Sequence, residues 1–495
     1  MKKHIDIKSL YKYIMIFFSG KNKSYYNFDW ETYKKYYYYL TGYSNKDEFW
    51  WHYIHLGEPN GFIYFDINNN NEHYFISNNS YTDQKLTEKK EIIHNNERSI
   101  CPRKTIYYYV DFVCQHINRT GIQVVTIYLA KQLLKCQDEF YIDIIFVKWN
   151  NTVSYLEPCN KDEIDFLLNF NEVSDIFPSI EYENYDPIHL NSYRQFSDCI
   201  FFCPELTFPI YNDLPSKLKN YLETYHLKSI YILYDIIPLV LGEYNCIRQG
   251  FKSYMAKNLL FANKIITISN FTKIEFIQYC QQNNLYNYNF PSIESIPLPH
   301  QYRNKPKIES NTDITSKITI LVPGTIEPRK QQLKLLKIFN SFLKNNPKID
   351  IEMIVFGNIL KLLEDDVMKE IKKSKDKIKY VGIINNDTLC EYYKKATFSC
   401  FISKYEGFGF PIAESLWHGT PVLTSNFGSM LEIANCGGCY SINSHNELEI
   451  YDALDNLIKK PEIILKLKSE INSNKFFTWY DYCKNIYIEI LKEFN

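Results

Sequence analysis

The sequence lacks a net charge, a long apolar segment and a recognisable secretion signal. Its 56 basic and 57 acidic residues give a formal net charge of −1, so there is no electrostatic reason to expect nucleic acid or an anionic membrane as a partner. No segment approaches the roughly 20 apolar residues that span a membrane. The apolar run YIMIFF after MKKHIDIKSL is short and has no small-residue cleavage site. These absences predict a cytoplasmic protein.

A disulfide framework is also missing. The 13 cysteines are odd in number and scattered without a pattern, which favours free thiols over disulfide bonds. One close pair, Cys436 and Cys439 in CGGC, has no second pair to complete it. It is therefore weak evidence for a metal or redox site.

What the sequence does contain is an ordinary globular composition, 45% hydrophobic and 23% charged, in a chain of 495 residues. That length predicts two or three domains. We expect an aromatic N-terminal extension with a polar linker over residues 1–98, a first domain over 99–300, a second domain over 301–475 and a final helix over 476–495.

Beyond residue 98, apolar runs alternate with segments of helical spacing. The runs TIYYYVDFV, IDIIFV, DCIFFC, SIYILY and KIITI predict strands, and residues 121–135 predict a helix. After a polar link over 303–317, the pattern repeats with ITILVPG, IDIEMIVFG, KIKYVG and TFSCFIS. This alternation predicts two α/β domains with doubly wound parallel sheets. Ligands of such sheets bind at the carboxyl ends of strands, so we expect the site in a cleft between the domains.

The first candidate site is LVPGTIEPRK, residues 321–330. A strand is expected to end at Gly324, and Arg329 and Lys330 are expected to open the following helix. Backbone N–H groups at a helix start attract anions. The two side chains add positive charge, with Arg329 suited to forked contacts with a phosphate and Lys330 acting as a point charge. Solvated side chains in a first turn are the alternative, but cations oppose the helix dipole there. The segment therefore favours phosphate binding.

The second candidate site is YEGFGFPIAES, residues 405–415. Glu406 is expected in a loop at the end of a strand, and Glu414 about one turn into a helix. Gly407 and Gly409 would let the loop backbone approach a ligand closely, and carboxylates accept hydrogen bonds from vicinal hydroxyls. The segment is thus either a surface turn before an amphipathic helix, or a site where one acid binds a hexose and the other a ribose.

Three residues of the first domain are weaker candidates. Gly121, after INRT, offers a flexible turn into a helix that would bring backbone N–H groups to a diphosphate. Asp235 in YDIIPL ends a strand and is as consistent with a turn as with a substrate contact. Ser269 in ITISNFTK is expected to cap a helix.

Together these segments resemble the retaining glycosyltransferases of the GT-B fold, specifically glycosyltransferase family 4, over residues 105–495. Val124 departs from the pattern because the family often has Arg there, and Tyr234 stands where it commonly has His. FTWYDYCKNIYIEIL resembles the family's C-terminal helix, which crosses back to the first domain. The resemblance also rests on GTIEPRK, EGFGFPIAE, YVGIINNDTLCEYYKKATFSCFIS, HGTPVLTSNFGSMLEIA, RTGIQVV and YDIIPL.

The resemblance implies a GT-B architecture of two Rossmann-like domains and a role for each matched residue. Arg329 and Lys330 would neutralise the diphosphate of a nucleotide-sugar. Glu406 would contact the hexose hydroxyls, Glu414 would hold the ribose, and Asp235 is a candidate for orienting the acceptor. The other implied donor contacts are Gly121, Gly324, Gly382, Ile383, Ile384, Gly407, Phe408, Gly409 and Phe410.

The resemblance also implies a reaction. A hexose, with mannose from GDP-mannose as first choice and a UDP-linked hexose as alternative, would move with retention to a hydroxyl of a glycan or lipid-linked oligosaccharide. A lipid-linked acceptor would allow peripheral association with the cytoplasmic membrane face. No enzymic nucleophile stands out, which favours front-face attack. No metal or other cofactor is expected, because cations and helix dipoles stabilise the leaving group, and the expected cleft loops contain no Asp-x-Asp motif.

Two other hypotheses stay open. Another GT-B enzyme, such as a sugar-nucleotide epimerase or a disaccharide synthase or phosphorylase, would share the phosphate-binding residues. A catalytically silent glycan-binding or scaffolding subunit would be expected to lack Arg329, Lys330 or Glu406, and the chain has all three. Residues 1–98 resemble a short helical module attached to some polysaccharide glycosyltransferases, and we expect their aromatic stripe to serve packing. The sequence does not indicate an oligomeric state.

Overall fold

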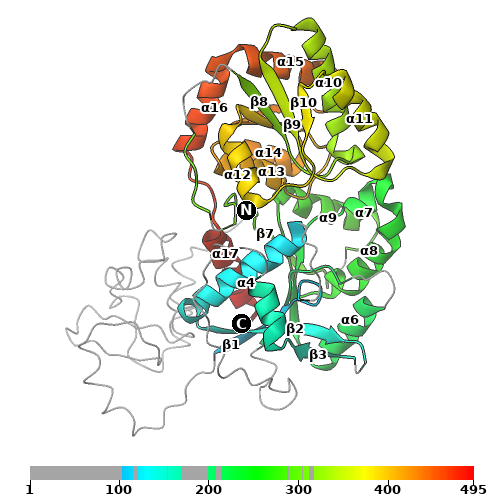
Figure 1. Ribbon diagram of the computed structural model, residues 1–495. Helices are drawn as coiled ribbons and strands as arrows, with labels where there is room; N and C mark the ends of the chain where they lie inside the picture. The colour runs from blue at the N-terminus through cyan, green and yellow to red at the C-terminus, as the bar shows by residue number, and fades with distance from the viewer. Residues whose placement is uncertain are drawn as a thin grey trace, which may run out of the picture. The chain divides into compact units, whose positions relative to one another are not determined.

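The computed structural model describes residues 103–114, 121–152, 154–169, 199–207, 213–286, 289–303, 305–310 and 317–494. The expected N-terminal extension, residues 1–98, lies outside these ranges. The described residues form two largely parallel β-sheets with helices on both faces (Figure 1), which confirms the predicted α/β class. We call the first sheet with its helices the first domain, and the second sheet with its helices the second domain.

The first sheet has seven strands in the order β3-β2-β1-β4-β5-β6-β7. Strands β4 to β7 follow β1 in parallel, and β3 pairs with β2 in antiparallel. The central strand β4, CIFFC, is apolar along its whole length, as expected of a strand covered by helices on both faces. The seven strands are β1 (Lys104–Tyr109), β2 (Ile142–Asn150), β3 (Tyr155–Pro158), β4 (Cys199–Cys203), β5 (Lys228–Leu233), β6 (Lys264–Thr267) and β7 (Ser292–Ser295).

Helices α6, α8 and α9 share one apolar core with this sheet. Helix α4 is joined to the same sheet by a hydrogen bond. The Tyr108 hydroxyl of β1 donates to the carbonyl oxygen of Thr126 in α4, at 2.7 Å. The Tyr128 ring of α4 stacks on Trp479, the first residue of α17 (Trp479–Phe494), with ring centroids 5.3 Å apart. The other elements are α4 (Gly121–Phe140), α5 (Lys161–Asn169), α6 (Leu214–Thr224), α7 (Ile237–Val240), η4 (Gly242–Tyr244), α8 (Asn245–Lys257), η5 (Leu259–Phe261) and α9 (Asn270–Gln282).

The second sheet has six strands in the order β10-β9-β8-β11-β12-β13, and all neighbouring strands are parallel. They are β8 (Ile318–Val322), β9 (Ile351–Val355), β10 (Ile378–Tyr380), β11 (Phe398–Phe401), β12 (Val422–Ser425) and β13 (Cys439–Ile442).

Helices cover both faces of the second sheet (Figure 1). One core joins the strands to α10, α11, α15 and α16, and a smaller core joins them to α12. The elements are η6 (Pro328–Lys330), α10 (Gln332–Asn345), η7 (Lys361–Leu363), α11 (Glu364–Lys373), α12 (Asn386–Lys395), α13 (Phe410–Trp417), α14 (Gly428–Ala434), α15 (Glu447–Lys459) and α16 (Pro461–Ser473).

The strand order of the second sheet places both candidate segments together. The chain adds β9 and β10 on one side of β8, and β11 to β13 on the other. Loops that follow the two strands at such a reversal leave the sheet edge in opposite directions and leave room for a ligand between them. The two loops here are residues 323–331 after β8 and residues 402–409 after β11.

The chain passes between the domains twice, and the two connecting segments are joined by hydrogen bonds. The Phe477 carbonyl oxygen, between α16 and α17, accepts from the backbone N–H groups of His300, at 2.9 Å, and Gln301, at 3.3 Å. Helix α17 is then held on the first domain by the buried ammonium of Lys264, which lies 3.0 Å from Glu489 and 3.0 Å from Glu493.

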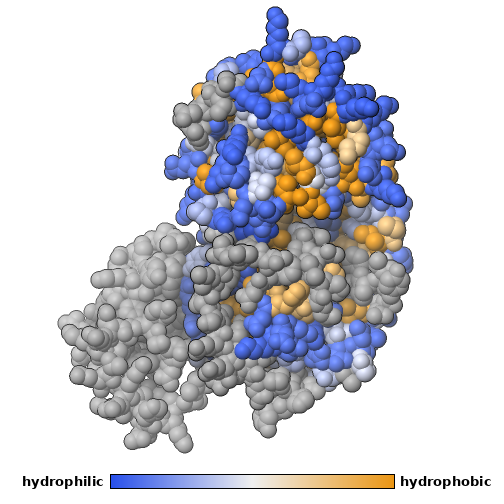
Figure 2. Space-filling model, viewed as in Figure 1, coloured by the Kyte–Doolittle hydropathy of each residue, from blue (hydrophilic) through white to orange (hydrophobic). Residues whose placement is uncertain are grey.

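No helix among the described residues is long and apolar enough to cross a bilayer. On the face that Figure 2 shows, hydrophilic side chains are interspersed with apolar ones. Among the large apolar side chains of the second domain, Ile383, Leu362 and Leu448 are the most exposed, at 75%, 71% and 67%. Ile383 lies three residues after the end of β10, at the carboxyl edge of the sheet.

Candidate active site

Residues 323–331, which we call the cation loop, carry Arg329 and Lys330. We predicted that both residues open the helix after β8, and this was wrong. They belong to the separate turn η6, and α10 begins only at Gln332. Gln331 lies between them with a left-handed backbone (φ +58°), and its side-chain amide donates to the carbonyl oxygen of Ile402, at 2.9 Å. This contact with the end of β11 fixes the break between the turn and the helix.

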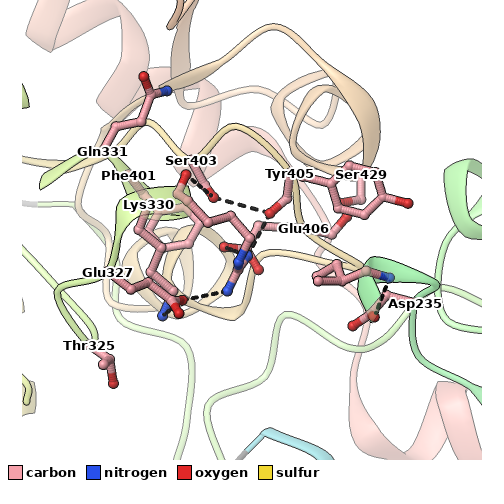
Figure 3. Close-up of polar contacts among 12 residues, drawn as sticks. Asp235, Thr325, Glu327, Lys330, Gln331, Phe401, Ser403, Tyr405, Glu406 and Ser429 are labelled. Carbon is pink, nitrogen blue, oxygen red and sulfur yellow. Dashed lines mark hydrogen bonds and ion pairs between the residues drawn. The ribbon is translucent and has the colours of Figure 1, made fainter. Parts of the chain in front are cut away.

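The Arg329 guanidinium is buried, and each of its nitrogens has a protein acceptor. Figure 3 shows three of the residues that contact it, Glu327, Tyr405 and Glu406. Nε donates to the Tyr244 hydroxyl, at 3.2 Å, and Nη2 donates to Glu327 Oε1, at 2.6 Å. Nη1 donates to the carbonyl oxygen of Tyr405, at 2.5 Å, and lies 2.6 Å from Glu406 Oε1. Burial works against the charge, but the two carboxylates outweigh it and raise the pKa of Arg329, so the guanidinium stays positive.

Lys330 has fewer protein contacts than Arg329. Its Nζ lies 3.5 Å from Glu327 Oε1, and a Cβ added to Gly324 would lie 3.3 Å from the same Nζ. Gly324 in turn packs closely on Gly357. A Cβ added to Gly357 would lie 2.5 Å from the Gly324 carbonyl. The Gly357 N–H donates to the carbonyl oxygen of Gly382, at 2.8 Å. The loops after β8, β9 and β10 therefore meet at one edge of the sheet, with the Lys330 ammonium beside Gly324.

Residues 402–409, which we call the sugar loop, carry Glu406 and three of the predicted donor contacts. The Ser429 hydroxyl of α14 donates to the Glu406 carbonyl oxygen, at 2.8 Å. We expected Gly407 to allow a ligand to approach, but its nearest neighbour is the first domain. A Cβ at Gly407 would lie 2.1 Å from the Tyr234 carbonyl oxygen, and its own carbonyl oxygen accepts from the Ser269 hydroxyl at 2.7 Å. Gly407 is therefore required by contact between the domains.

The remaining residues of this segment lie where the two domains face each other. Gly409 has φ +120° and precedes α13, which begins at Phe410. The rings of Phe408 and Phe410 meet edge to face, with centroids 5.5 Å apart. A Cβ at Gly121, the first residue of α4, would lie 3.4 Å from the Phe410 ring. The structure thus brings Gly121 of the first domain against the start of α13 in the second domain. A ligand site between the two domains would require this proximity.

Three residues of the first domain also have defined positions. Asp235 Oδ1 accepts from the Ile237 N–H, at 2.9 Å, a contact that the turn interpretation expects. Burial raises the Asp235 pKa to about 6, although the Ile237 N–H and Arg329 act to lower it. Ser269 accepts from the Thr272 N–H and caps α9, as predicted. Tyr234, at the position where the resembled family commonly has His, is buried.

Glu414 lies one turn into α13, as predicted. Burial raises its pKa to about 7, against the effects of the Arg303 charge and a Tyr393 hydrogen bond, which lower it. On the same sheet edge, a Cβ at Gly382 would find no atom within 4 Å, and Ile383 is exposed. The backbone after β10 is therefore open to a planar ligand, whereas Ile384 packs against the small core at α12.

Hydrogen bonds from the second domain hold the start of α9. The Glu432 carboxylate of α14 accepts from the Asn270 N–H, at 3.0 Å, and from the Phe271 N–H, at 2.5 Å. The Tyr405 hydroxyl donates to Glu275 Oε2, at 2.8 Å. These contacts place the sugar loop directly against the first domain.

The sequence did not reveal two residues that the structure adds to the site. Glu327 lies within GTIEPRK, two positions before Arg329, so an acid next to two cations in the sequence is the signal that points to it. Tyr244 carries no such signal, because its hydroxyl reaches Glu327, at 3.1 Å, only through the arrangement of the two domains. The cysteines of CGGC are free thiols, and the described residues contain no cluster of three or more His, Cys, Asp or Glu side chains placed to hold a metal.

Comparison with known protein families gives a match to the second domain. The family described as glycosyl transferases group 1 matches residues 304–475, which contain Arg329, Lys330, Glu406 and Glu414. These residues are similar to the glycosyl transferases group 1 family. The matched segment, which we call the group 1 domain, holds the cation loop and the sugar loop, whereas Gly121, Asp235 and Tyr244 lie outside it.

Two curated relatives are also named as glycosyltransferases. The O-antigen chain mannosyltransferase B of Escherichia coli is 27% identical over 255 residues, which cover 50% of this chain and 61% of the relative. An uncharacterized glycosyltransferase of Methanocaldococcus jannaschii is 40% identical over 57 residues, 12% of this chain and 15% of the relative. Each match spans less than two thirds of the relative's own length.

Solved structures match a larger part of the chain. The crystal structure of Anabaena HepE in complex with UDP and glucose covers 79% of this chain and 99% of its own, with a TM-score of 0.51 and 13% identity. HepE in complex with UDP-glucose gives a TM-score of 0.50 over the same shares, also at 13% identity. At this identity the likeness shows the fold, and it confirms the predicted GT-B architecture.

Proposed function

We propose that the protein is a retaining hexosyltransferase that moves a sugar from a nucleotide-sugar to a hydroxyl of a glycan or lipid-linked oligosaccharide. The observation that carries the proposal is the convergence of two cations and Glu406 at the strand-order reversal of the group 1 domain. Arg329 Nη1 and Glu406 Oε1 lie 2.6 Å apart, so a positive group for a diphosphate and an acceptor for sugar hydroxyls adjoin. A nucleotide-sugar presents both chemistries at adjacent atoms.

Each residue has a proposed role in donor binding. Lys330 contacts the diphosphate, and the Arg329 charge adds to the positive field at the same place. Glu406 accepts from the hexose hydroxyls, and Glu414 accepts from the ribose hydroxyls. The open backbone at Gly382 and Ile383, together with Ile384, borders the base, and the start of α4 at Gly121 offers N–H groups from the opposite side.

The proposed chemistry relies on charge stabilisation and positioning. The bond between the anomeric carbon and the diphosphate breaks, and the acceptor hydroxyl attacks from the same face. The departing diphosphate takes the hydroxyl proton, while Lys330 and Arg329 stabilise its growing charge. Asp235, whose carboxylate is near Arg329 and Glu406, orients the acceptor. We propose that no metal ion is needed, because the two cations supply the positive charge.

Mannose from GDP-mannose is the proposed donor. The support is the E. coli relative, whose name describes an O-antigen chain mannosyltransferase. A UDP-linked hexose is the second candidate, supported by HepE, which was crystallised with UDP and glucose. A growing polysaccharide is accordingly the proposed acceptor class.

The decisive experiment is a thermal-shift screen against GDP, UDP, ADP and their sugar conjugates, followed by mass spectrometry of products with a glycan acceptor. We expect a shift with GDP or UDP and their sugars, and transfer that persists in EDTA. NMR of the product should show the donor's anomeric configuration. If no nucleotide raises the melting temperature, the proposal fails. Nucleotide binding without any transfer would instead favour another GT-B enzyme or a silent subunit.

A further inference from the structure

Tyr244 is a first-domain residue whose hydroxyl lies within the cation loop of the second domain. The hydroxyl accepts from Arg329 Nε, at 3.2 Å, and donates to Glu327 Oε2, at 3.1 Å. An arginine can only donate and a carboxylate can only accept, so the directions of both hydrogen bonds are fixed. Burial raises the Tyr244 pKa, against the effect of the Arg329 charge, so the hydroxyl keeps its proton at neutral pH.

Two hydrogen bonds support the backbone that carries Tyr244. Arg248, in α8, donates from Nε to the carbonyl oxygen of Pro238, at 2.9 Å, and from Nη2 to that of Leu241, at 3.1 Å. Pro238 belongs to α7, and Leu241 lies between α7 and η4. The position of the Tyr244 hydroxyl is therefore set by the body of the first domain.

The carboxylate that Tyr244 holds competes for the cations of the proposed donor site. Glu327 Oε1 lies 2.6 Å from Arg329 Nη2 but 3.5 Å from Lys330 Nζ. Its other oxygen is held by Tyr244. If that hydrogen bond were lost, the carboxylate would be free to rotate toward Lys330 and form a closer ion pair there. Such a pair would occupy the ammonium that a diphosphate needs.

We propose that Tyr244 is a positioning residue that directs Glu327 toward Arg329 and so leaves the Lys330 ammonium available to a nucleoside diphosphate. The inference rests on the proposed function and deepens it. Because Tyr244 belongs to the first domain and the cations to the second, the affinity of the second domain for a diphosphate depends on where the first domain lies.

A double-mutant cycle on nucleoside-diphosphate binding tests this role. Isothermal titration with GDP and with UDP is carried out on the full chain and on Tyr244→Phe, Glu327→Gln and the double variant. Tyr244→Phe should weaken binding about tenfold, the scale of a hydrogen bond to a charged group. In the Glu327→Gln background, the same change should cost less than about twofold, because the amide no longer competes for Lys330 as an anion. Equal losses in both backgrounds, or no loss in either, would overturn the role.

A second measurement needs no ligand and separates this inference from the proposed function. The rate at which acetic anhydride modifies Lys330 is followed by peptide mass spectrometry, with exposed Lys344 as the internal reference. Tyr244→Phe should slow the labelling of Lys330 and leave Lys344 unchanged, because Glu327 then pairs with Lys330. Tyr286→Phe, at an exposed tyrosine of the same domain, should change neither rate. An unchanged Lys330 rate in Tyr244→Phe refutes the inference, whereas failure of the parent chain to bind GDP or UDP refutes the proposed function.

Discussion

The guanidinium of Arg329 and the carboxylate of Glu406 lie 2.6 Å apart and join the cation loop to the sugar loop. Both side chains are nearly buried, with 10% and 14% exposure. A buried charge without its partner is costly, so neither residue can be changed without affecting the other. The proposed diphosphate contact and the proposed hexose contact therefore depend on each other through this ion pair.

Replacing Glu406 with Gln should strongly reduce the proposed transfer while the protein stays folded. The amide keeps the shape but loses the charge that pairs with Arg329 and the strong acceptor for sugar hydroxyls. We expect a fall in kcat/KM of about 100-fold or more, the scale seen when one transition-state contact is removed. Product formation is measured with the nucleotide-sugar identified by the screen. Glu462→Gln, at an exposed acid of the same domain, is the matched control, and near-parent activity in Glu406→Gln would contradict the assigned role.

Lys330→Ala should weaken nucleoside-diphosphate binding by about tenfold or more, because it removes a charge-assisted contact. The loss should shrink as the salt concentration rises, since salt screens the attraction in the parent protein. Titration calorimetry at two ionic strengths measures both effects. Lys344→Ala removes an exposed cation from the same domain and should leave binding unchanged. Equal affinity of the parent and Lys330→Ala would exclude Lys330 from the anion site.

Gly407→Ala should destabilise the protein through contact between the domains. The added methyl group would lie 2.1 Å from the Tyr234 carbonyl oxygen, and overpacking of this kind costs about 1–3 kcal/mol of the free energy of unfolding. Gly242→Ala is a close control, because its Cβ would meet no atom within 4 Å. Urea denaturation compares the two variants. Similar unfolding free energies for both would mean that the domains do not meet at Gly407 in solution.

The Glu414 carboxyl should make stability depend on pH. Burial raises its pKa from 4.5 to about 7, so the unfolded chain loses this proton first as the pH rises. The contribution of Glu414 to stability is therefore present below 4.5 and is lost between 4.5 and about 7. Glu414→Gln cannot ionise, so its stability relative to the parent should rise over that range by up to about 3 kcal/mol. Urea denaturation at several pH values measures the difference, and a constant difference would contradict the shift.

The same carboxyl should make nucleotide affinity depend on pH. Ribose hydroxyls donate more strongly to the ionised carboxylate than to the neutral acid. Affinity of the parent protein should therefore increase between about pH 6 and pH 8, and Glu414→Gln should lack this increase. Calorimetric titrations with the nucleotide selected by the screen provide the comparison. A pH dependence that persists in Glu414→Gln would assign it to another group.

The fold was predictable because strand and helix patterns are local properties of the sequence. The run CIFFC is apolar throughout, as expected of a strand buried on both faces, and ITILV is apolar except for Thr319; each forms a strand. Glu414 was likewise expected about one turn into a helix, and it lies there on α13. The break at Gln331 was not predictable, because a left-handed residue held by the Ile402 carbonyl depends on a contact 71 residues away. The same limit applies to Gly407 and Tyr244, whose roles arise only where two distant parts of the chain meet.

The two chain crossings confine how the domains can move. Since His300 and Gln301 both bind the Phe477 carbonyl oxygen, the outgoing and returning segments are tied together at one place. Two domains whose chain crossings lie at a single place can swing about it when their other contacts open, but they cannot slide past each other over long distances. The distance between Tyr244 and the cation loop would then measure the angle by which one domain swings relative to the other. A pair of labels placed across this distance would measure that angle, and removal of α17, residues 479–494, would detach the returning segment from the first domain.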